Sequence, residues 1–441
     1  MTRWFPFVPE RRLAAAVAAA AALWLLPAPV GPAAGAAALG VLALLLAAEF
    51  VRLPTGRTLT VAREAPASVG LGDTVELTYR VTNPTGTPVS ARLRDLLPAC
   101  VEGGLGERTV QVPARGVLTL PVPLRGLTRA EAPLGPVGAR LTTALGLLGA
   151  RVRVAPPDTI RVVPSMSGVR RFRLLALQHR LDAAGVRTLR RRGEGQGFAG
   201  LREYAVGDDP RHIDWKASAK RAKLITREFT IERSQTVLTL IDAGRGMTQL
   251  AGEFPRFEHA LSSAMILTDI AAAAGDRVGT LVFDDGIRAF VPAQRSHGAL
   301  QAIREAVVPV TASPREPDYA SAFRFLAAHQ RKRALVVLFT DVLGVRASKA
   351  LLAHVARSAE RHLALVVALR NDPLHALAVP GAVTSASGLF AHAAAAELLE
   401  SREEALERMR RAGAIVLDVS PSVMTASVVN RYLELKARGA L

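Results

Sequence analysis

Charged, aromatic and glycine residues are concentrated between Gly193 and Met247 of this 441-residue chain, and four side chains there could carry chemistry: Asp208, Asp209, His212 and Asp214. Such a set could bind a metal through oxygen and nitrogen ligands, or it could form an acid/base pair. Three basic residues lie among them, namely Arg211, Lys216 and Lys220. A salt-bridge network would have the same composition. We favour such a network, or a partner-binding surface, over catalysis.

A second candidate site follows directly. The apolar run Val237–Ile241 has the character of a buried strand, and it leads into Asp242, Gly244 and Gly246. An acidic residue that leaves a strand in this way lies where open α/β sheets place their ligand sites. From residue 236 to the end, strand and helix patterns alternate, which predicts a doubly wound, largely parallel sheet with helices on both faces.

These residues make the chain recognisable as a relative of a known family. The motifs concerned are Arg202-Glu203-Tyr204, Gly207-Asp208, RHIDWKASAK from Arg211 to Lys220, and DAGRGM from Asp242 to Met247. In this combination and order the chain resembles the bacterial family called domain of unknown function fifty-eight. The resemblance implies a membrane-anchored protein whose C-terminal domain is related to the von Willebrand factor type A fold.

We assign partner binding to residues of this motif: Arg202, Glu203, Tyr204, Gly207, Asp208, Arg211, Asp214, Trp215 and Lys216. For Trp215 the first interpretation is a packing anchor and the second is an interface hot spot.

The type A resemblance also raises the question of a metal. Type A domains that bind a divalent ion use Asp-x-Ser-x-Ser, a threonine from a later loop and a further aspartate. Asp242 and Asp341 match the two aspartates, but Gly244 and Gly246 stand at both serine positions, and no threonine lies near Pro317. The two carboxylates could hold Mg²⁺ weakly through water. We favour the alternative, in which they cap neighbouring backbone at the sheet edge.

The N-terminus is predicted to enter a membrane. No charged residue occurs from Leu13 to Ala48, and prolines interrupt this run near its middle. We predict two helices, at about 12–27 and 32–51, forming a transmembrane hairpin within residues 1–57. Arginines flank both ends, so the positive-inside rule places both ends, and the soluble domains, in the cytoplasm of a bacterial inner membrane protein. The alternative is a cleaved signal peptide.

Residues 58–163 contain several short strand-like runs, such as the alternation of apolar and polar residues around Val75–Val81, with Gly and Pro between them. This pattern predicts an all-β, sandwich-like domain. The one cysteine, Cys100, excludes an internal disulfide. A basic linker is expected at 164–200, where Arg170, Arg171, Arg190, Arg191 and Arg192 indicate an anionic partner. We prefer lipid headgroups to nucleic acid, because the predicted membrane anchor places this segment near lipid. No aromatic platform or zinc finger accompanies these arginines, so nucleic acid is the weaker alternative. Residues 201–441 form the family motif and the type A-like domain.

The sequence lacks the signature motifs of several enzyme classes. The chain has no Gly-x4-Gly-Lys-Ser/Thr phosphate loop, no His-Glu-x2-His helix and no Gly-x-Ser-x-Gly elbow. We therefore expect a non-catalytic membrane scaffold. The family resemblance implies a MoxR-type AAA+ ATPase as its partner, in the assembly or remodelling of complexes. The alternatives are a metal-dependent hydrolase and a membrane-associated binder of nucleic acid or anionic lipid.

Overall fold

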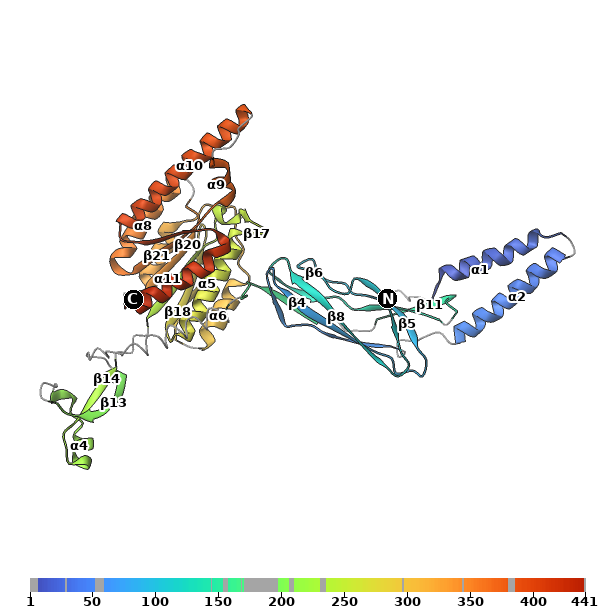
Figure 1. Cartoon of the computed structure of the whole chain (residues 1–441), viewed down its shortest axis with the longest axis horizontal. Helices are drawn as coiled ribbons and strands as arrows, with labels where there is room; N and C mark the ends of the chain where they lie inside the picture. Colours follow the sequence, from blue (N-terminus) through green and yellow to red (C-terminus); the bar gives the residue numbers. More distant parts are fainter. Residues whose placement is uncertain are drawn as a thin grey trace. The chain divides into compact units, whose positions relative to one another are not determined.

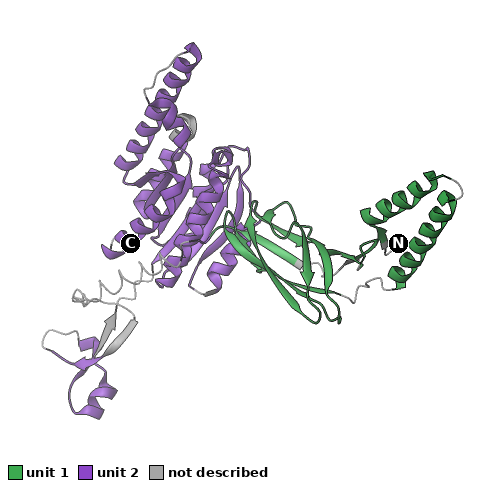
Figure 2. Ribbon diagram, turned by 45° about the vertical axis from the view of Figure 1, so that its right-hand side comes forward, with its two compact units in different colours: residues 1–165 green, residues 166–441 purple. Residues whose placement is uncertain are grey.

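The computed structural model describes most of the chain, namely residues 7–27, 30–51, 59–143, 145–153, 158–167, 169, 197–205, 210–230, 235–295, 297–342, 345–379 and 385–439. The chain divides into two compact units, residues 1–165 and residues 166–441 (Figure 2). The described parts confirm three coarse expectations: an apolar N-terminal helix, a β-rich region and a C-terminal mixed α/β domain.

The N-terminal elements are β1 (Phe7–Pro9), α1 (Arg11–Ala22), η1 (Leu23–Leu25) and α2 (Val30–Val51). The first helical stretch thus ends at Leu25, slightly before the predicted boundary. Helix α2 has a mean hydropathy of 2.1, and within the described residues it alone is long and apolar enough to cross a membrane. Large apolar side chains project from it into solvent, among them Val41, Leu44 and Phe50.

The β-rich region is built mainly from a five-stranded and a four-stranded sheet, with a smaller three-stranded sheet beside them. The five strands, in spatial order, are β1, β11 (Leu148–Arg153), β10 (Gly138–Thr142), β5 (Val89–Arg94) and β7 (Glu107–Val112). The four are β2 (Thr60–Glu64), β4 (Thr74–Thr82), β8 (Val117–Gly126) and β6 (Val101–Gly103). The three are β3 (Ser68–Gly70), β12 (Asp158–Val163) and β9 (Ala130–Leu134). Alternating buried and exposed residues along β4 and β5 explain the strands, since one face of each packs into the core.

The apolar helices are tied to this β-rich region by backbone pairing and by one buried carboxylate. Strand β1 pairs with β11, an addition that its short Phe-Val-Pro sequence did not indicate. Near the end of α2, the buried side chain of Glu49 accepts hydrogen bonds from three backbone N–H groups, those of Leu145, Leu147 and Leu148, at 2.7–3.2 Å. The N–H of Leu148 also donates to the hydroxyl oxygen of Thr143, at 3.4 Å. Glu49 therefore joins the helix to the loop between β10 and β11.

A small segment, residues 197–230, precedes the α/β domain. It contains β13 (Gly197–Glu203), η2 (Pro210–His212), α4 (Trp215–Arg221) and β14 (Ile225–Thr230). Strands β13 and β14 pair antiparallel. Strand β13 begins inside the range that the sequence assigned to a linker.

The α/β domain contains a six-stranded sheet, of which Figure 1 labels β18, β20 and β21. The strand order is β19 (Ile287–Gln294), β18 (Arg277–Phe283), β15 (Thr236–Asp242), β20 (Leu335–Thr340), β21 (Leu363–Leu369) and β22 (Ile415–Val419). All neighbours pair in parallel except β18 and β19. Short elements follow β15, namely η3 (Arg245–Thr248), β16 (Leu250–Ala251) and β17 (Phe254–Pro255).

Helices cover both faces of this sheet. One apolar core contains buried residues of α5 (Arg256–Ala273), α6 (His297–Val307) and α11 (Pro421–Ala437). The other contains residues of α7 (Tyr319–His329), α8 (Val345–Arg361) and α10 (Ala386–Arg411). The sequence pattern predicted most of these elements. It did not predict α10 or the short α9 (Asp372–Ala378).

We predict that Glu49→Ala loosens the loop between β10 and β11. The substitution removes the carboxylate that accepts the N–H groups of Leu145, Leu147 and Leu148, and a buried N–H group that is left without an acceptor costs about 1–3 kcal/mol. Amide hydrogen exchange at Leu145, Leu147 and Leu148 should become faster. The matched control is Glu64→Ala, which removes only an exposed ion pair with Arg80. Equal protection in the two variants would contradict the role given to Glu49.

Candidate functional site

A pocket of about 270 Å³ lies at the carboxyl edge of the α/β sheet, beyond the ends of β15 and β20. Its lining residues are Asp242, Arg245, Gly246, Gln249, Glu316, Pro317, Tyr319 and Asp341. Asp242 ends β15, and Asp341 directly follows β20. Parallel strands bring their carboxyl ends to one edge of a sheet, so the two aspartates predicted from the sequence do line the same pocket.

Asp242 is buried and fully engaged in hydrogen bonds. Its Oδ1 accepts the backbone N–H of Gly244 at 2.7 Å. Its Oδ2 accepts the hydroxyls of Tyr319 at 3.0 Å and Thr340 at 2.7 Å. The carboxylate therefore fixes the turn after β15, and it also joins this turn to α7 and to the end of β20.

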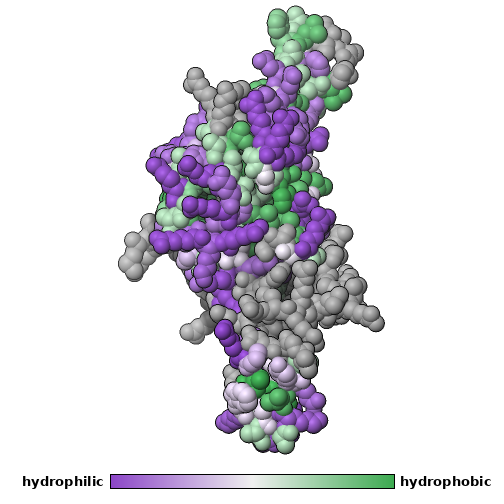
Figure 3. Space-filling model, turned by 90° about the vertical axis from the view of Figure 1, so that its left-hand side faces the viewer, coloured by the Kyte–Doolittle hydropathy of each residue, from purple (hydrophilic) through white to green (hydrophobic). Residues whose placement is uncertain are grey.

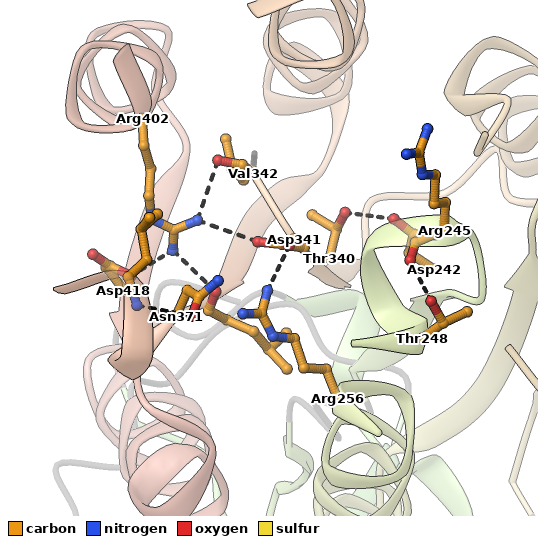
Figure 4. A network of polar contacts seen from close by, with 12 residues as sticks. Asp242, Arg245, Thr248, Arg256, Thr340, Asp341, Val342, Asn371, Arg402 and Asp418 are labelled. Atoms are coloured by element: carbon orange, nitrogen blue, oxygen red, sulfur yellow. Dashed lines mark hydrogen bonds and ion pairs between the residues drawn. The ribbon is translucent and has the colours of Figure 1, made fainter. Parts of the chain in front are cut away.

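Asp341 is paired with two buried guanidinium groups (Figure 4). Arg256, the first residue of α5, donates to Oδ2 at 2.6 Å, and Arg402 of α10 lies 3.5 Å from Oδ1. Arg402 also donates to Asp418 at 2.6 Å and to the carbonyl oxygens of Val342 and Leu369. The charge of Asp341 is thus balanced from within the domain.

Burial changes the acidity of both carboxyl groups. Burial raises the pKa of Asp242 to about 6, although hydrogen bonds from Thr340, Gly244 and Tyr319 act in the opposite direction. Burial also raises the pKa of Asp341 to about 6, against the opposing charges of Arg256 and Arg402. Both groups are ionised at neutral pH. Each already accepts hydrogen bonds or ion pairs from buried donors, so neither is a free general base.

Gly244 and Gly246 lie where the backbone is closely packed against other residues of this edge. A Cβ atom on Gly244 would lie 2.8 Å from Cδ of Pro317 and 3.0 Å from the carbonyl oxygen of Arg315. A Cβ atom on Gly246 would lie 3.1 Å from Cβ of Asp341. A serine at residue 244 would therefore collide with Pro317, and a serine at residue 246 would require Asp341 to shift by a few tenths of an ångström.

The residues at this edge do not fit a divalent ion. The two serine hydroxyls are missing, and a Cβ atom at residue 244 would lie only 2.8 Å from Pro317. Two guanidinium groups hold the carboxylate of Asp341 and would repel a cation there. Across the described residues, no group of three or more His, Cys, Asp and Glu is placed to hold a metal.

The motif residues lie mainly in the 197–230 segment. Arg202 and Glu203 belong to β13, and Tyr204 follows it with its N–H bonded to the Leu224 carbonyl oxygen. Arg211 lies in η2. Lys216 lies on α4, exposed.

Asp214 and Trp215 form the start of α4. The Asp214 carboxylate caps the helix by accepting the Ala217 N–H at 3.0 Å, which is a structural role. Trp215 is 68% exposed, so it is not the packing anchor that the first interpretation required. An exposed tryptophan on a capped helix is a typical interface residue.

Other predicted residues lie outside the described ranges. These are Gly207 and Asp208 of the motif, and Arg170, Arg171, Arg190, Arg191 and Arg192 of the basic stretch. The proposed grouping of Asp208 with His212 and Asp214 therefore stays a prediction.

Three residues of the site were missed by sequence reasoning. Arg256, Arg402 and Tyr319 complete the polar network, yet each looks ordinary in the sequence. Arg402 lies in the charged run SREEALERMRR, whose composition is typical of a solvated helix face. The sequence did offer one indication of these residues. Asp242 and Asp341 were predicted at the sheet edge, and buried carboxylates require hydrogen-bond donors.

The chain thus combines an apolar N-terminal helix, a β-rich region and an α/β domain. In the pocket of the α/β domain, Arg256 and Arg402 neutralise the charge of Asp341. Residues 200–385 match the model of the family described as protein of unknown function DUF58. The chain is similar to the uncharacterized protein Rv1480 of Mycobacterium tuberculosis, with 26% identity over 156 residues, covering 34% of this chain and 49% of that protein. It is also similar to the uncharacterized protein YeaD of Bacillus subtilis, with 28% identity over 178 residues, covering 39% and 43%. The chain thus matches less than half the length of these relatives.

Among solved structures, a Salmonella alpha-2-macroglobulin reacted with methylamine matches 24% of this chain and 7% of its own, at 20% identity and a TM-score of 0.19. The CARDB domain of a Pyrococcus furiosus protein, in complex with di-metal ions, matches 22% of this chain and 87% of its own, at 19% identity and a TM-score of 0.16. We draw no conclusion about this chain from similarities at these scores.

We predict that Asp341→Asn lowers the free energy of unfolding by roughly 3–5 kcal/mol, because it leaves the buried charge of Arg256 without its carboxylate and leaves Arg402 with Asp418 as its remaining ion pair. Urea denaturation followed by circular dichroism measures the change. The control is Glu316→Gln, which breaks an exposed pair with Arg245 and should shift the free energy by less than about 0.5 kcal/mol. Similar values for the two variants would show that the buried pairs contribute little.

A second prediction concerns Gly244→Ser, which restores one residue of the metal-binding type A pattern. Because its Cβ would contact Pro317, the variant should lose about 1–3 kcal/mol of stability. Gly286→Ser is the matched control, since a Cβ there has no neighbour within 4 Å. The same denaturation experiment compares them. A Gly244→Ser protein as stable as the wild type would mean that the turn after β15 has room for a hydroxyl.

Proposed function

We propose that this protein is a membrane-anchored, non-catalytic scaffold that acts by binding a protein partner. The exposed side chain of Trp215 is the observation that carries this proposal. Asp214 caps the helix on which it lies, and Ser218 fastens the helix to β14 through hydrogen bonds with the backbone N–H and C=O of Ile225 at 2.9 and 3.4 Å. A large aromatic ring is thus held in solvent on a fixed frame, which is the arrangement of an interface anchor.

The membrane part of the proposal rests on the N-terminal helices. Helix α2 has 22 residues, so it is about 33 Å long, close to the roughly 30 Å hydrocarbon thickness of a bilayer. Helix α1 and η1 would form the other arm of a hairpin. With arginines outside both ends, the soluble units would be cytoplasmic, at the bacterial inner membrane.

We further propose that the α/β unit is related to the von Willebrand factor type A fold. The parallel sheet, its antiparallel edge strand β19 and the pocket at its carboxyl edge support this relation. In this chain, Arg256 and Arg402 provide the positive charge that a cation provides in metal-binding relatives of that fold. The pocket would then take part in recognition without a metal.

The partner we propose is a MoxR-type AAA+ ATPase. This proposal rests on the family resemblance and on the lack of a phosphate-binding loop in the sequence, since a remodelling scaffold without its own ATP site depends on a partner for energy. The basic stretch that includes Arg190, Arg191 and Arg192 would add contacts with anionic lipid headgroups.

The alternative hydrolase has weaker support. It would use Asp214 as an acid or base, but that carboxylate accepts the Ala217 N–H as a helix cap. It would otherwise use Asp242 and Asp341, which are held by hydroxyl and guanidinium donors.

We predict that Trp215→Ala weakens binding of the purified full chain to its MoxR-type ATPase by about 30-fold, the effect of losing an interface anchor worth about 2 kcal/mol. Isothermal titration calorimetry in detergent measures the affinity. Leu250→Ala removes another exposed apolar side chain of the same unit and should leave the affinity unchanged. Failure of the wild-type chain to bind the ATPase would overturn the proposed partner, and equal affinities would overturn the role of Trp215.

A further inference from the structure

The start of α10 and the adjacent α9 form an exposed apolar surface that the site does not use. The sequence contains no Asp, Glu, Lys or Arg from Pro373 to Ala396, in a chain that is 21% charged. Large apolar side chains in this stretch face solvent, with Phe390 78% exposed. The others are Leu377 and Val379 at the end of α9, and Leu389 in the first turn of α10. We call these four side chains and the first three turns of α10 the apolar tip.

Only a narrow stripe of α10 is covered at this tip. Helix α9 packs against α10, and the His392 ring nitrogen Nδ1 lies 3.0 Å from the carbonyl oxygen of Leu377. Ala395 is buried, and Gly388 and Leu399 on the same stripe are half-buried. At 100° per residue, the remaining exposed positions span about 220° of the helix circumference. They carry mainly alanine, leucine and phenylalanine (Figure 3, where the upper end of the molecule is largely green).

The breadth of this exposure indicates what covers the tip. A helix that docks in a protein groove shows one apolar stripe with polar residues opposite, whereas a helix that is apolar on most sides lies in an apolar medium. The tip has no Asp, Glu, Lys or Arg side chain that could form an ion pair with a protein partner and so fix its orientation. A lipid bilayer provides such a medium, and the same chain carries α2, which is apolar enough to cross one.

The length of the tip matches one leaflet. From Ala386 to Ala396 the helix rises about 16 Å, which is close to half of the roughly 30 Å hydrocarbon thickness. The next residue is Glu397, followed by Glu400, and both are exposed. These carboxylates would lie at the headgroup level, where the charged part of α10 begins.

We propose that the apolar tip inserts into one leaflet of the membrane in which the chain is anchored. The proposal rests on the proposed membrane anchoring, and it adds a second membrane contact on the α/β unit. This contact would tether the pocket-bearing domain to the bilayer independently of α2.

The test uses the full chain in phosphatidylcholine and phosphatidylglycerol vesicles, with the native thiol removed by Cys100→Ala. Single cysteines are introduced by Phe390→Cys and, as a second tip position, Ala393→Cys, and each is labelled with an environment-sensitive fluorophore. Leu44→Cys on α2 is the bilayer control, and Lys332→Cys on an exposed loop is the aqueous control. Quenching is measured with nitroxide groups on the lipid acyl chains and, separately, with aqueous iodide.

We expect the acyl-chain nitroxide to quench both tip labels to the same extent as the Leu44→Cys label. We expect iodide to quench them several-fold less than it quenches the Lys332→Cys label. Iodide quenching equal to that at Lys332→Cys would overturn the proposal. Protection from both quenchers would also overturn it, because a protein surface, such as a second copy of the chain, would then cover the tip. Absence of nitroxide quenching at Leu44→Cys would instead show that the membrane anchoring itself is wrong.

Discussion

The ion pairs of Asp341 with Arg256 and Arg402 are the interaction on which the carboxyl edge of the α/β domain depends. They connect the start of α5, the end of β20 and the middle of α10, and Arg402 extends the network to Asp418 on β22. Buried charges are costly unless they are paired, so these groups hold one another in place. Arg402 and the buried apolar residues Ala405, Leu406 and Met409 fix helix α10, which also carries the apolar tip, to the sheet.

The same pairs decide what the pocket can do. A cation site needs carboxylate oxygens that are free to bind a metal, and here the domain's own guanidinium groups occupy those of Asp341. Close packing of Gly244 against Pro317 leaves no space for the missing hydroxyl. The charge balance and the steric fit both disfavour a cation at this edge, which is why we propose partner binding in preference to metal-dependent hydrolysis.

The sequence predicted the sheet better than the site. Strand β15, Thr236–Asp242, contains the predicted run Val237–Ile241, because buried parallel strands are continuous apolar runs. Helix α10 was missed because its first turns, to Ala396, contain no Asp, Glu, Lys or Arg, whereas nine of the fifteen residues from Glu397 to Arg411 are charged, so no single amphipathic pattern runs along the helix. The partner of Asp341 could not be inferred, since a buried Arg402 and a solvated arginine look the same in sequence.

Titration of the purified full chain with Mg²⁺ and Mn²⁺, followed by calorimetry and beside Asp242→Ala, tests the central claim most directly. If Arg256 and Arg402 provide the charge at the sheet edge, neither ion should bind stoichiometrically, and the wild type and the variant should give the same trace. Tight, stoichiometric binding that Asp242→Ala abolishes would contradict the claim, since a cation would then displace or join the guanidinium groups at Asp341.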